Sequence, residues 1–167
     1  MRNSLVTVVT QPTNIKLRYF KQIIDLIKTG GEVKTSRGDL KRYLLRADLI
    51  AYELWNDRVI CTATLKNPFN SYRTKVFNSA KAVTNLNFKK ELGYIATRPN
   101  FEGKGHCTKL LKQLFREISA NSIYATTRKP AIVHILGKFN FSQTGKTYNK
   151  DLKLLIYNGT KQHTSRR

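Results

Sequence analysis

The stretch of residues 91–118 constrains the fold most, because it reads as a strand, a tight glycine-rich turn and a helix in direct succession. Its first part, 91–97, is a short run of β-branched, aromatic and other apolar residues, which predicts a strand. Pro99 requires the chain to leave the sheet after this run. The last part begins near Gly105 and carries apolar residues at helical spacing, namely Leu110, Leu111, Leu114, Phe115 and Ile118. The sequence therefore predicts a strand joined to an amphipathic helix by the loop 100–105.

Two glycines, Gly103 and Gly105, flank a single residue in this loop. Glycine lets the backbone turn tightly with its N–H groups pointing outward, and the helix that follows presents its positive dipole end at the same place. Such a site favours phosphate. The same glycines also suit a helix start that needs only their geometry, so the pattern alone leaves both interpretations open.

Two other phosphate loops do not fit. A dinucleotide-binding fingerprint requires a third glycine where Thr108 stands. A P-loop ending at 145–147 requires a glycine where Asn140 stands, and the segment that follows reads as a strand and not as a helix. We therefore expect neither a Rossmann site nor a P-loop.

With its flanking strand and helix, the loop resembles that of the GNAT superfamily of acyl-CoA-dependent N-acyltransferases. The pyrophosphate loop of that family reads Gln/Arg-x-x-Gly-x-Gly/Ala, often RGKGIG, and this chain has EGKGHC at 102–107. Gly103, Lys104 and Gly105 match the family pattern, whereas Glu102 and Cys107 depart from it. The resemblance implies that the cofactor is acetyl-CoA or another acyl-CoA.

It also implies which residues bind that cofactor. The backbone of the central strand would hold the pantetheine arm, and the loop with the first turn of the helix would hold the pyrophosphate. The residues are Ile95, Ala96, Thr97, Glu102, Gly103, Lys104, Gly105, His106, Cys107 and Thr108.

The patterns on either side of this unit extend the resemblance over almost the whole chain. Strands are predicted at 5–9, 49–55, 58–66, 122–126, 141–147 and 152–157, and helices begin near Thr13, Asp39, Asn70 and Pro130. The pair Asn56-Asp57 is typical of a two-residue hairpin turn. Helical spacing predicts that Leu17 and Tyr43 face inward.

This order implies an α/β fold of the GNAT type, a central mixed β-sheet flanked by helices. In that fold two parallel strands splay apart, and here they would be 91–97 and 122–126, which a helix connects. We expect a single acyltransferase domain over residues 1–158 and a basic tail over 159–167.

The charge of the chain is unusual. Its formal net charge is +21, from 31 Lys and Arg against 10 Asp and Glu, which is more than a cofactor with a few phosphates accounts for. A polyanionic partner is the leading interpretation, and tRNA, DNA and the ribosome all fit it. A solvated basic surface would give the same composition.

The segment before the central strand is the best candidate for nucleic-acid contact. Asn70 or Ser71 is the expected cap of a helix that runs to about residue 82, with its basic residues on the exposed side. There Tyr72, Arg73 and Lys75 combine an aromatic plane with cations, a combination that stacks bases and neutralises phosphates. A solvated helix edge would look the same.

Acyl transfer to an amine requires a base for the amine proton and an acid for the leaving thiolate. Glu91, at the start of the central strand, is in register with the general-base glutamate of some family members, although an ion pair with a neighbouring lysine is an equal alternative. Leu136 stands where many family members carry the tyrosine that protonates the leaving thiolate. His134 and Tyr124 are therefore the candidate general acids.

The cysteines and the hydropathy of the sequence bear on where the protein is located in the cell. Cys61 and Cys107 have no zinc or disulfide spacing, so we expect reduced thiols and no metal site. The sequence has neither a signal-like segment nor an apolar stretch long enough for a bilayer, which predicts a cytoplasmic protein without membrane contact.

Two functions follow as hypotheses. The first is an N-acyltransferase that moves an acetyl group from acetyl-CoA to an amine of an aminoacyl-tRNA, a nucleobase or a ribosomal protein. The alternative is a catalytically degenerate GNAT-like domain that binds nucleic acid or protein, which the departures at Glu102, Cys107 and Leu136 would explain. Retained cofactor binding distinguishes them.

Overall fold

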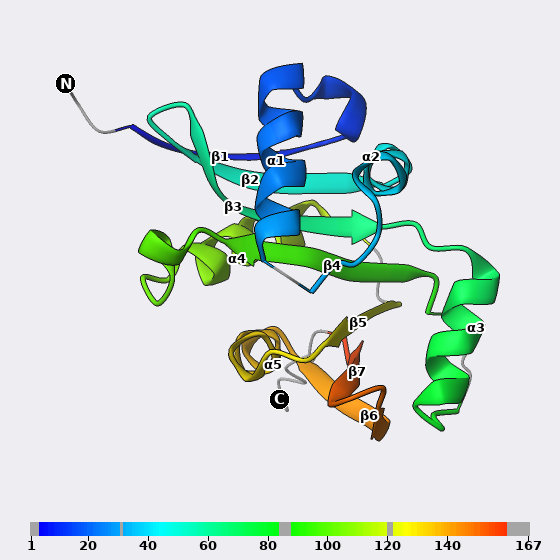
Figure 1. The fold of residues 1–167 in the computed structure, drawn as a ribbon. Coiled ribbons are helices and arrows are strands. Elements are labelled where there is room, and N and C mark those ends of the chain that lie inside the picture. The colour runs from blue at the N-terminus through cyan, green and yellow to red at the C-terminus, as the bar shows by residue number, and fades with distance from the viewer. Residues whose placement is uncertain (1–3, 31, 84–87, 120–121, 160–167) are drawn as a thin grey trace. The chain divides into compact units, whose positions relative to one another are not determined.

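The structure is a computed structural model, and it describes residues 4–30, 32–83, 88–119 and 122–159. The strands and helices occur in the predicted order, with two 3₁₀ turns added (Figure 1). They are β1 (Leu5–Thr10), η1 (Pro12–Asn14), α1 (Leu17–Thr29), α2 (Arg37–Leu45), β2 (Leu49–Trp55), β3 (Arg58–Lys66), α3 (Asn70–Ser79), β4 (Lys90–Thr97), η2 (Pro99–Phe101), α4 (His106–Glu117), β5 (Ile123–Thr127), α5 (Pro130–Lys138), β6 (Phe141–Tyr148) and β7 (Leu152–Tyr157).

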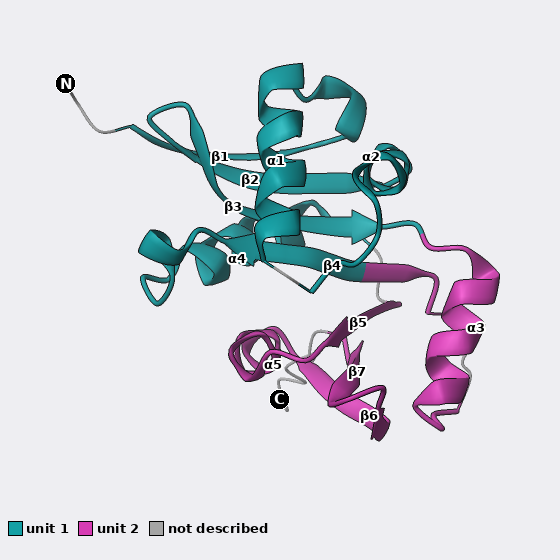
Figure 2. Cartoon of the chain, viewed as in Figure 1, with its two compact units in different colours: residues 1–67, 92–119 teal, residues 68–91, 120–167 magenta. Residues whose placement is uncertain are grey.

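The chain divides into two compact units, coloured separately in Figure 2. Unit 1 comprises residues 1–67 and 92–119, and unit 2 comprises residues 68–91 and 120–167. The boundary falls inside β4, so Lys90 and Glu91 belong to unit 2. The single domain expected over 1–158 stays a prediction, and the expected basic tail lies outside the described residues from 160 onward.

Unit 1 contains the strands in the order β1-β2-β3-β4. β1 pairs antiparallel with β2, and β2 pairs antiparallel with β3. The turn between β2 and β3 is the predicted one: Asn56 and Asp57 have φ angles of 47° and 63°, the left-handed conformation that a two-residue type I′ turn requires. The bounds of both strands are those expected from the sequence.

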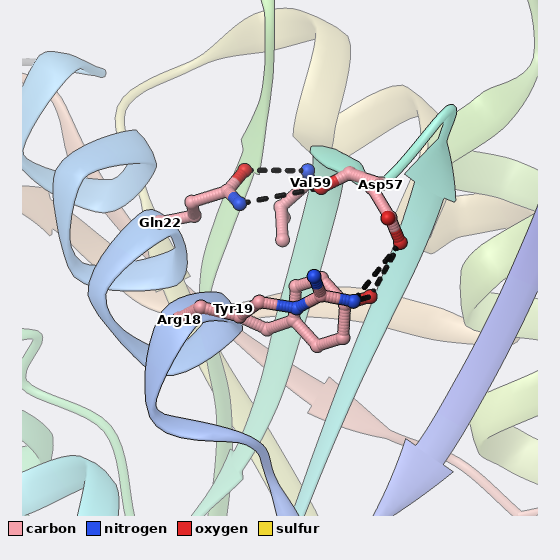
Figure 3. A network of polar contacts seen from close by, with 5 residues as sticks. All are labelled: Arg18, Tyr19, Gln22, Asp57 and Val59. Atoms are coloured by element: carbon pink, nitrogen blue, oxygen red, sulfur yellow. Dashed lines mark hydrogen bonds and ion pairs between the residues drawn. The ribbon is translucent and has the colours of Figure 1, made fainter.

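Polar contacts join this turn to α1 (Figure 3). The Tyr19 hydroxyl donates to Asp57 Oδ1 at 2.6 Å, and Arg18 contacts the same carboxylate at 3.2 Å. Gln22 donates to the Asp57 carbonyl at 3.3 Å and accepts from the Val59 N–H at 2.9 Å. The side chains of one helical face therefore hold the hairpin against α1.

Helices cover both faces of the unit 1 strands. Tyr52 of β2 packs against Tyr19 of α1, with ring centroids 6.0 Å apart. Its neighbour Glu53 contacts His106 of α4. Because successive residues of a strand point to opposite faces, α1 and α4 lie on opposite sides of β2.

Unit 2 contains an antiparallel sheet in the order β5-β7-β6, on which α3 packs. The core between them comprises Val76, Phe77, Ala80, Tyr124 and Leu154. Within it, the rings of Phe77 and Tyr124 meet edge to face, with centroids 5.4 Å apart. No helix among the described residues is long and apolar enough to cross a membrane.

The helix ends differ from the predicted ones for local reasons. Pro12 starts a 3₁₀ turn that takes up Thr13, so Lys16 and not Thr13 is the N-cap of α1. α2 begins earlier than Asp39, because the Ser36 hydroxyl caps the helix by accepting from the Asp39 N–H.

α3 also differs at both ends. Its N-cap is Phe69, so the expected caps Asn70 and Ser71 are already helical residues. The helix ends at Ser79, before the predicted position 82, because Lys81 adopts a left-handed φ of 49°.

Two inward-facing predictions are wrong. Leu17 is the first residue of α1 and is exposed, whereas the buried residues of the helix begin at Tyr19. Tyr43 is exposed because α2 is short and buries only Leu40 and Leu44, one helical turn apart.

Candidate functional site

The glycine loop of unit 1 adopts the backbone that its sequence predicts. Gly103 and Gly105 have φ angles of 69° and 81°, and Gly105 is the N-cap of α4. A Cβ atom at either position would meet nothing within 4 Å. Both glycines are therefore required by backbone conformation and not by crowding, and the space beside them is open to a ligand. A helix N-terminus with open space beside it can accept a phosphate group.

The charged side chains of the loop are Glu102 and Lys104. Glu102 and Lys104 are both exposed. Lys104 folds back over the preceding turn, where its ammonium donates to the Asn100 carbonyl at 2.8 Å and lies 5.9 Å from the centre of the Phe101 ring. The backbone N–H groups of 103–106 thus remain the main donors that the loop offers.

A buried carboxylate fixes the first residue of α4. His106 Nδ1 lies 2.7 Å from Glu53 Oε2, and Glu53 is 0% exposed. The other carboxylate oxygen accepts from the Thr7 hydroxyl at 3.4 Å, and the edge of His106 meets the Phe101 ring. A buried carboxylate needs such partners, so Glu53 and His106 stabilise each other. Sequence reasoning missed Glu53, although a single acidic residue in the apolar run of β2 is a signal.

The two cysteines of the chain lie in contact at the start of α4. Cys107 follows His106, and its thiol forms a hydrogen bond with Cys61 of β3, which together with burial raises the pKa of Cys61. Cys61 also lies 3.2 Å from the Thr97 hydroxyl. Both cysteines are free thiols, and both are buried. Sequence spacing did not predict that they pack together.

The part of β4 expected to hold the pantetheine arm is irregular. Tyr94 has a φ of 50°, which breaks the extended geometry just before Ile95. Ala96 is buried in the core of unit 1, whereas Ile95 and Thr97 are half-buried. After the strand, Arg98 donates from Nε to the Val59 carbonyl at 2.6 Å, which holds the end of β4 against β3.

Glu91 lies in a buried polar cluster of unit 2. Its side chain accepts from the Thr126 hydroxyl at 3.1 Å, and the residue is 2% exposed. Burial and the charge of Glu91 raise the pKa of both Tyr124 and Tyr148, the latter to about 12. Neither tyrosine hydroxyl has a hydrogen-bond partner among the described residues. Glu91 is therefore buried, and the alternative of an ion pair at the surface with a neighbouring lysine does not fit its position.

The candidate acids differ in position. Tyr124 shares the interior of unit 2 with Glu91. His134 is exposed on α5, and Leu136 on the same helix is fully buried. The structure thus brings Tyr124, but not His134, into the Glu91 cluster, and it adds Thr126 and Tyr148, which the sequence analysis did not single out.

One residue of the predicted nucleic-acid triplet does not face solvent. Arg73 is 6% exposed, and it donates to the Phe88 carbonyl at 3.4 Å inside unit 2. The prediction that Arg73 lies on the exposed side of α3 is wrong because its helix packs that face on the sheet. Tyr72, at 42% exposed, and Lys75 do face solvent.

Neither a model of a known protein family nor the sequence of a curated protein matches this chain. Solved structures do match it in fold. A GNAT family acetyltransferase from Streptococcus agalactiae superposes with a TM-score of 0.64 at 16% identity, over 90% of this chain and 93% of its own.

Two further neighbours have named ligands or substrates. A NatC complex bound to Gag peptide and CoA gives a TM-score of 0.68 at 14% identity, over 94% of this chain and 99% of the matched chain. The ribosomal-protein-S18-alanine N-acetyltransferase of Escherichia coli gives 0.59 at 12% identity, over 94% and 98%. The chain therefore has the α/β fold of the GNAT acyltransferases, and the predicted fold is confirmed.

Proposed function

We propose that this protein is an N-acyltransferase that moves an acetyl group, or another acyl group, from acyl-CoA to an amine. The observation that carries the proposal is the open, left-handed Gly103–Gly105 backbone at the N-terminus of α4, in a chain with the GNAT fold. N–H groups at such a helix start bind pyrophosphate without a dedicated cationic side chain. These N–H groups would therefore compensate for Glu102, which stands where the family pattern has Gln or Arg.

The family resemblance implies which residues would bind the acyl-CoA. The loop from Glu102 to Thr108 would bind the pyrophosphate, with His106 held in place by Glu53. The backbone of Ile95, Ala96 and Thr97 would align the pantetheine arm. Bound acyl-CoA supplies a thioester whose carbonyl carbon the amine attacks.

Glu91 would take the proton from the attacking amine, directly or through a water molecule. Its hydrogen bond from the Thr126 hydroxyl fixes the position of the carboxylate inside unit 2. Tyr124 is favoured over His134 as the donor to the departing thiolate, because it lies in the same interior as Glu91 whereas His134 is exposed.

The acceptor we propose is an amine presented with RNA, on an aminoacyl-tRNA, a nucleobase or a ribosomal protein. The net charge of +21 supports a polyanionic partner, with Tyr72 and Lys75 as candidate contacts. By its name, one structural neighbour acetylates a ribosomal protein. The alternative is a binding module without catalysis, which the buried Leu136 in place of the usual tyrosine favours.

Isothermal titration of acetyl-CoA against the protein tests the proposal. We expect wild type to bind and Gly105→Glu to lose binding, because the new carboxylate occupies the phosphate cradle. Gly105→Asn is the control, since Asn tolerates a left-handed φ and adds no charge; it should keep measurable binding. Absence of acetyl-CoA binding by folded, ligand-free wild type would contradict the proposed function.

A further inference from the structure

The two units differ in how their cations are balanced. In unit 1, Arg18 pairs with Asp57, Arg37 with Asp25 and Arg42 with Asp39. Unit 2 contains 14 Lys and Arg, five in 68–91 and nine in 120–167, against two acidic residues, Glu91 and Asp151. Glu91 is buried, so Asp151 is the exposed carboxylate of this unit.

The fold gathers cations at one end of the unit 2 sheet. The Arg128 guanidinium donates from Nη2 to the Asn149 carbonyl at 2.8 Å and from Nε to the Lys150 carbonyl at 3.0 Å. Lys153 lies opposite Thr127 in the β5–β7 register, next to Arg128 and Lys129. Four cations from two distant segments therefore converge at the β6–β7 turn.

A second group lies along β6. The Lys146 N–H donates to the Ala80 carbonyl at 2.6 Å, which brings Lys146 next to Lys81 at the end of α3. Both side chains are exposed. Gly145 makes this approach possible, because a Cβ there would lie 2.2 Å from the Ala80 carbonyl oxygen. We define the hairpin surface as Lys81, Arg128, Lys129, Lys146, Lys150 and Lys153.

We propose that the hairpin surface binds the phosphate backbone of RNA. Clustered like charges with one nearby carboxylate repel each other, and neutralisation by a polyphosphate relieves this repulsion. The cations follow a hairpin over several strands and turns, which suits an extended backbone better than a single small anion. Unit 2 also exposes the aromatic rings of Phe69 and Tyr72, one helical turn apart at the start of α3.

Exposed aromatic rings on the same unit as the cations suit unstacked bases, which RNA loops and ends provide and regular duplex DNA does not. The cations come from strands and turns and do not form the polar face of an amphipathic helix, which is the usual arrangement at a membrane surface. Because RNA is the proposed carrier of the acceptor amine, this inference rests on the proposed function for its purpose, but the binding itself requires no acyl-CoA.

Fluorescence anisotropy with labelled tRNA and the full chain tests this inference at several salt concentrations. The triple variant Lys81→Gln, Lys146→Gln, Lys150→Gln should weaken tRNA binding at least about tenfold and reduce the slope of log affinity against log salt by roughly two. The matched control, Lys21→Gln, Lys41→Gln, Lys112→Gln, removes three exposed lysines of unit 1 and should stay within about twofold of wild type.

Equal losses in the two triple variants, or no loss in the first, would overturn the inference, as would tighter binding to duplex DNA or to anionic lipid vesicles than to tRNA. Acetyl-CoA titration of the same proteins separates the two proposals. A chain that binds tRNA through the hairpin surface but does not bind acetyl-CoA would keep this inference and contradict the proposed function.

Discussion

His106 Nδ1 donates to Glu53 Oε2 across 2.7 Å, and this bond joins the first residue of α4 to the middle of β2. The two residues are 53 positions apart in the sequence. Their contact fixes the start of the helix whose N–H groups form the proposed pyrophosphate site.

Glu53→Ala should destabilise the protein by about 3 kcal/mol, because it leaves the His106 ring without its partner in a largely buried position. Urea unfolding followed by circular dichroism measures the change. Glu53→Gln is the control, since the amide can still accept from His106, and it should lose less than half as much. Equal stability of Glu53→Ala and wild type would show that the pair does not hold α4.

Gly145→Ala should destabilise unit 2 by more than about 2 kcal/mol. The residue has a φ of 65°, and its new Cβ would overlap the Ala80 carbonyl oxygen. Gly137→Ala is the matched control in the same unit, because Gly137 lies in α5 and a Cβ there meets nothing within 4 Å. The control should be neutral or stabilising by up to about 1 kcal/mol, as expected for alanine in a helix. The reverse ranking in thermal unfolding would contradict the packing of β6 on α3.

Stability should fall at alkaline pH partly through Tyr148. Burial and the charge of Glu91 raise its pKa to about 12, from the ordinary tyrosine value of 10.0. Between these values the unfolded chain releases the phenolic proton and the folded chain keeps it, so the free energy of unfolding decreases as pH rises. Tyr148→Phe should reduce this dependence between pH 10 and 12 and, because the hydroxyl has no partner among the described residues, should cost little stability at pH 7. An unchanged alkaline slope would contradict the buried cluster around Glu91.

Cys61 and Cys107 should react slowly with a thiol reagent in the folded protein. Both are buried, and the hydrogen bond to Cys107 together with burial raises the pKa of Cys61. Titration with a chromogenic disulfide should detect two thiols, each modified at least about 100-fold faster in urea than in buffer. Saturating acetyl-CoA should slow the folded-state reaction further, since Cys107 lies in the proposed cofactor loop. Fast reaction of either thiol in buffer would contradict its burial.

Much of the fold was predictable because its signals are local. The pair Asn56-Asp57 predicts a type I′ turn from two residues, and the strands on either side end where expected. Gly103 and Gly105 likewise predict the left-handed loop before α4.

The side-chain contacts of the candidate site were not predictable in this way. Glu53 meets His106, and Cys61 meets Cys107, only because β2 and β3 lie under α4, and sequence spacing carries no information on such contacts. The burial of Arg73 has the same origin, since the orientation of α3 depends on what it packs against. The sequence of α3 does not by itself specify whether Arg73 or Lys75, its two basic residues, turns inward.

Acyl transfer with Glu91 as base can be tested by following labelled acetyl groups from acetyl-CoA into aminoacyl-tRNA, free tRNA and ribosomal proteins. We expect wild type to label one of these acceptors, and Glu91→Gln to lower the rate at least about 100-fold with unchanged acetyl-CoA affinity. No label in any acceptor from wild type that binds acetyl-CoA, or an equal rate with Glu91→Gln, would contradict acyl transfer with Glu91 as base.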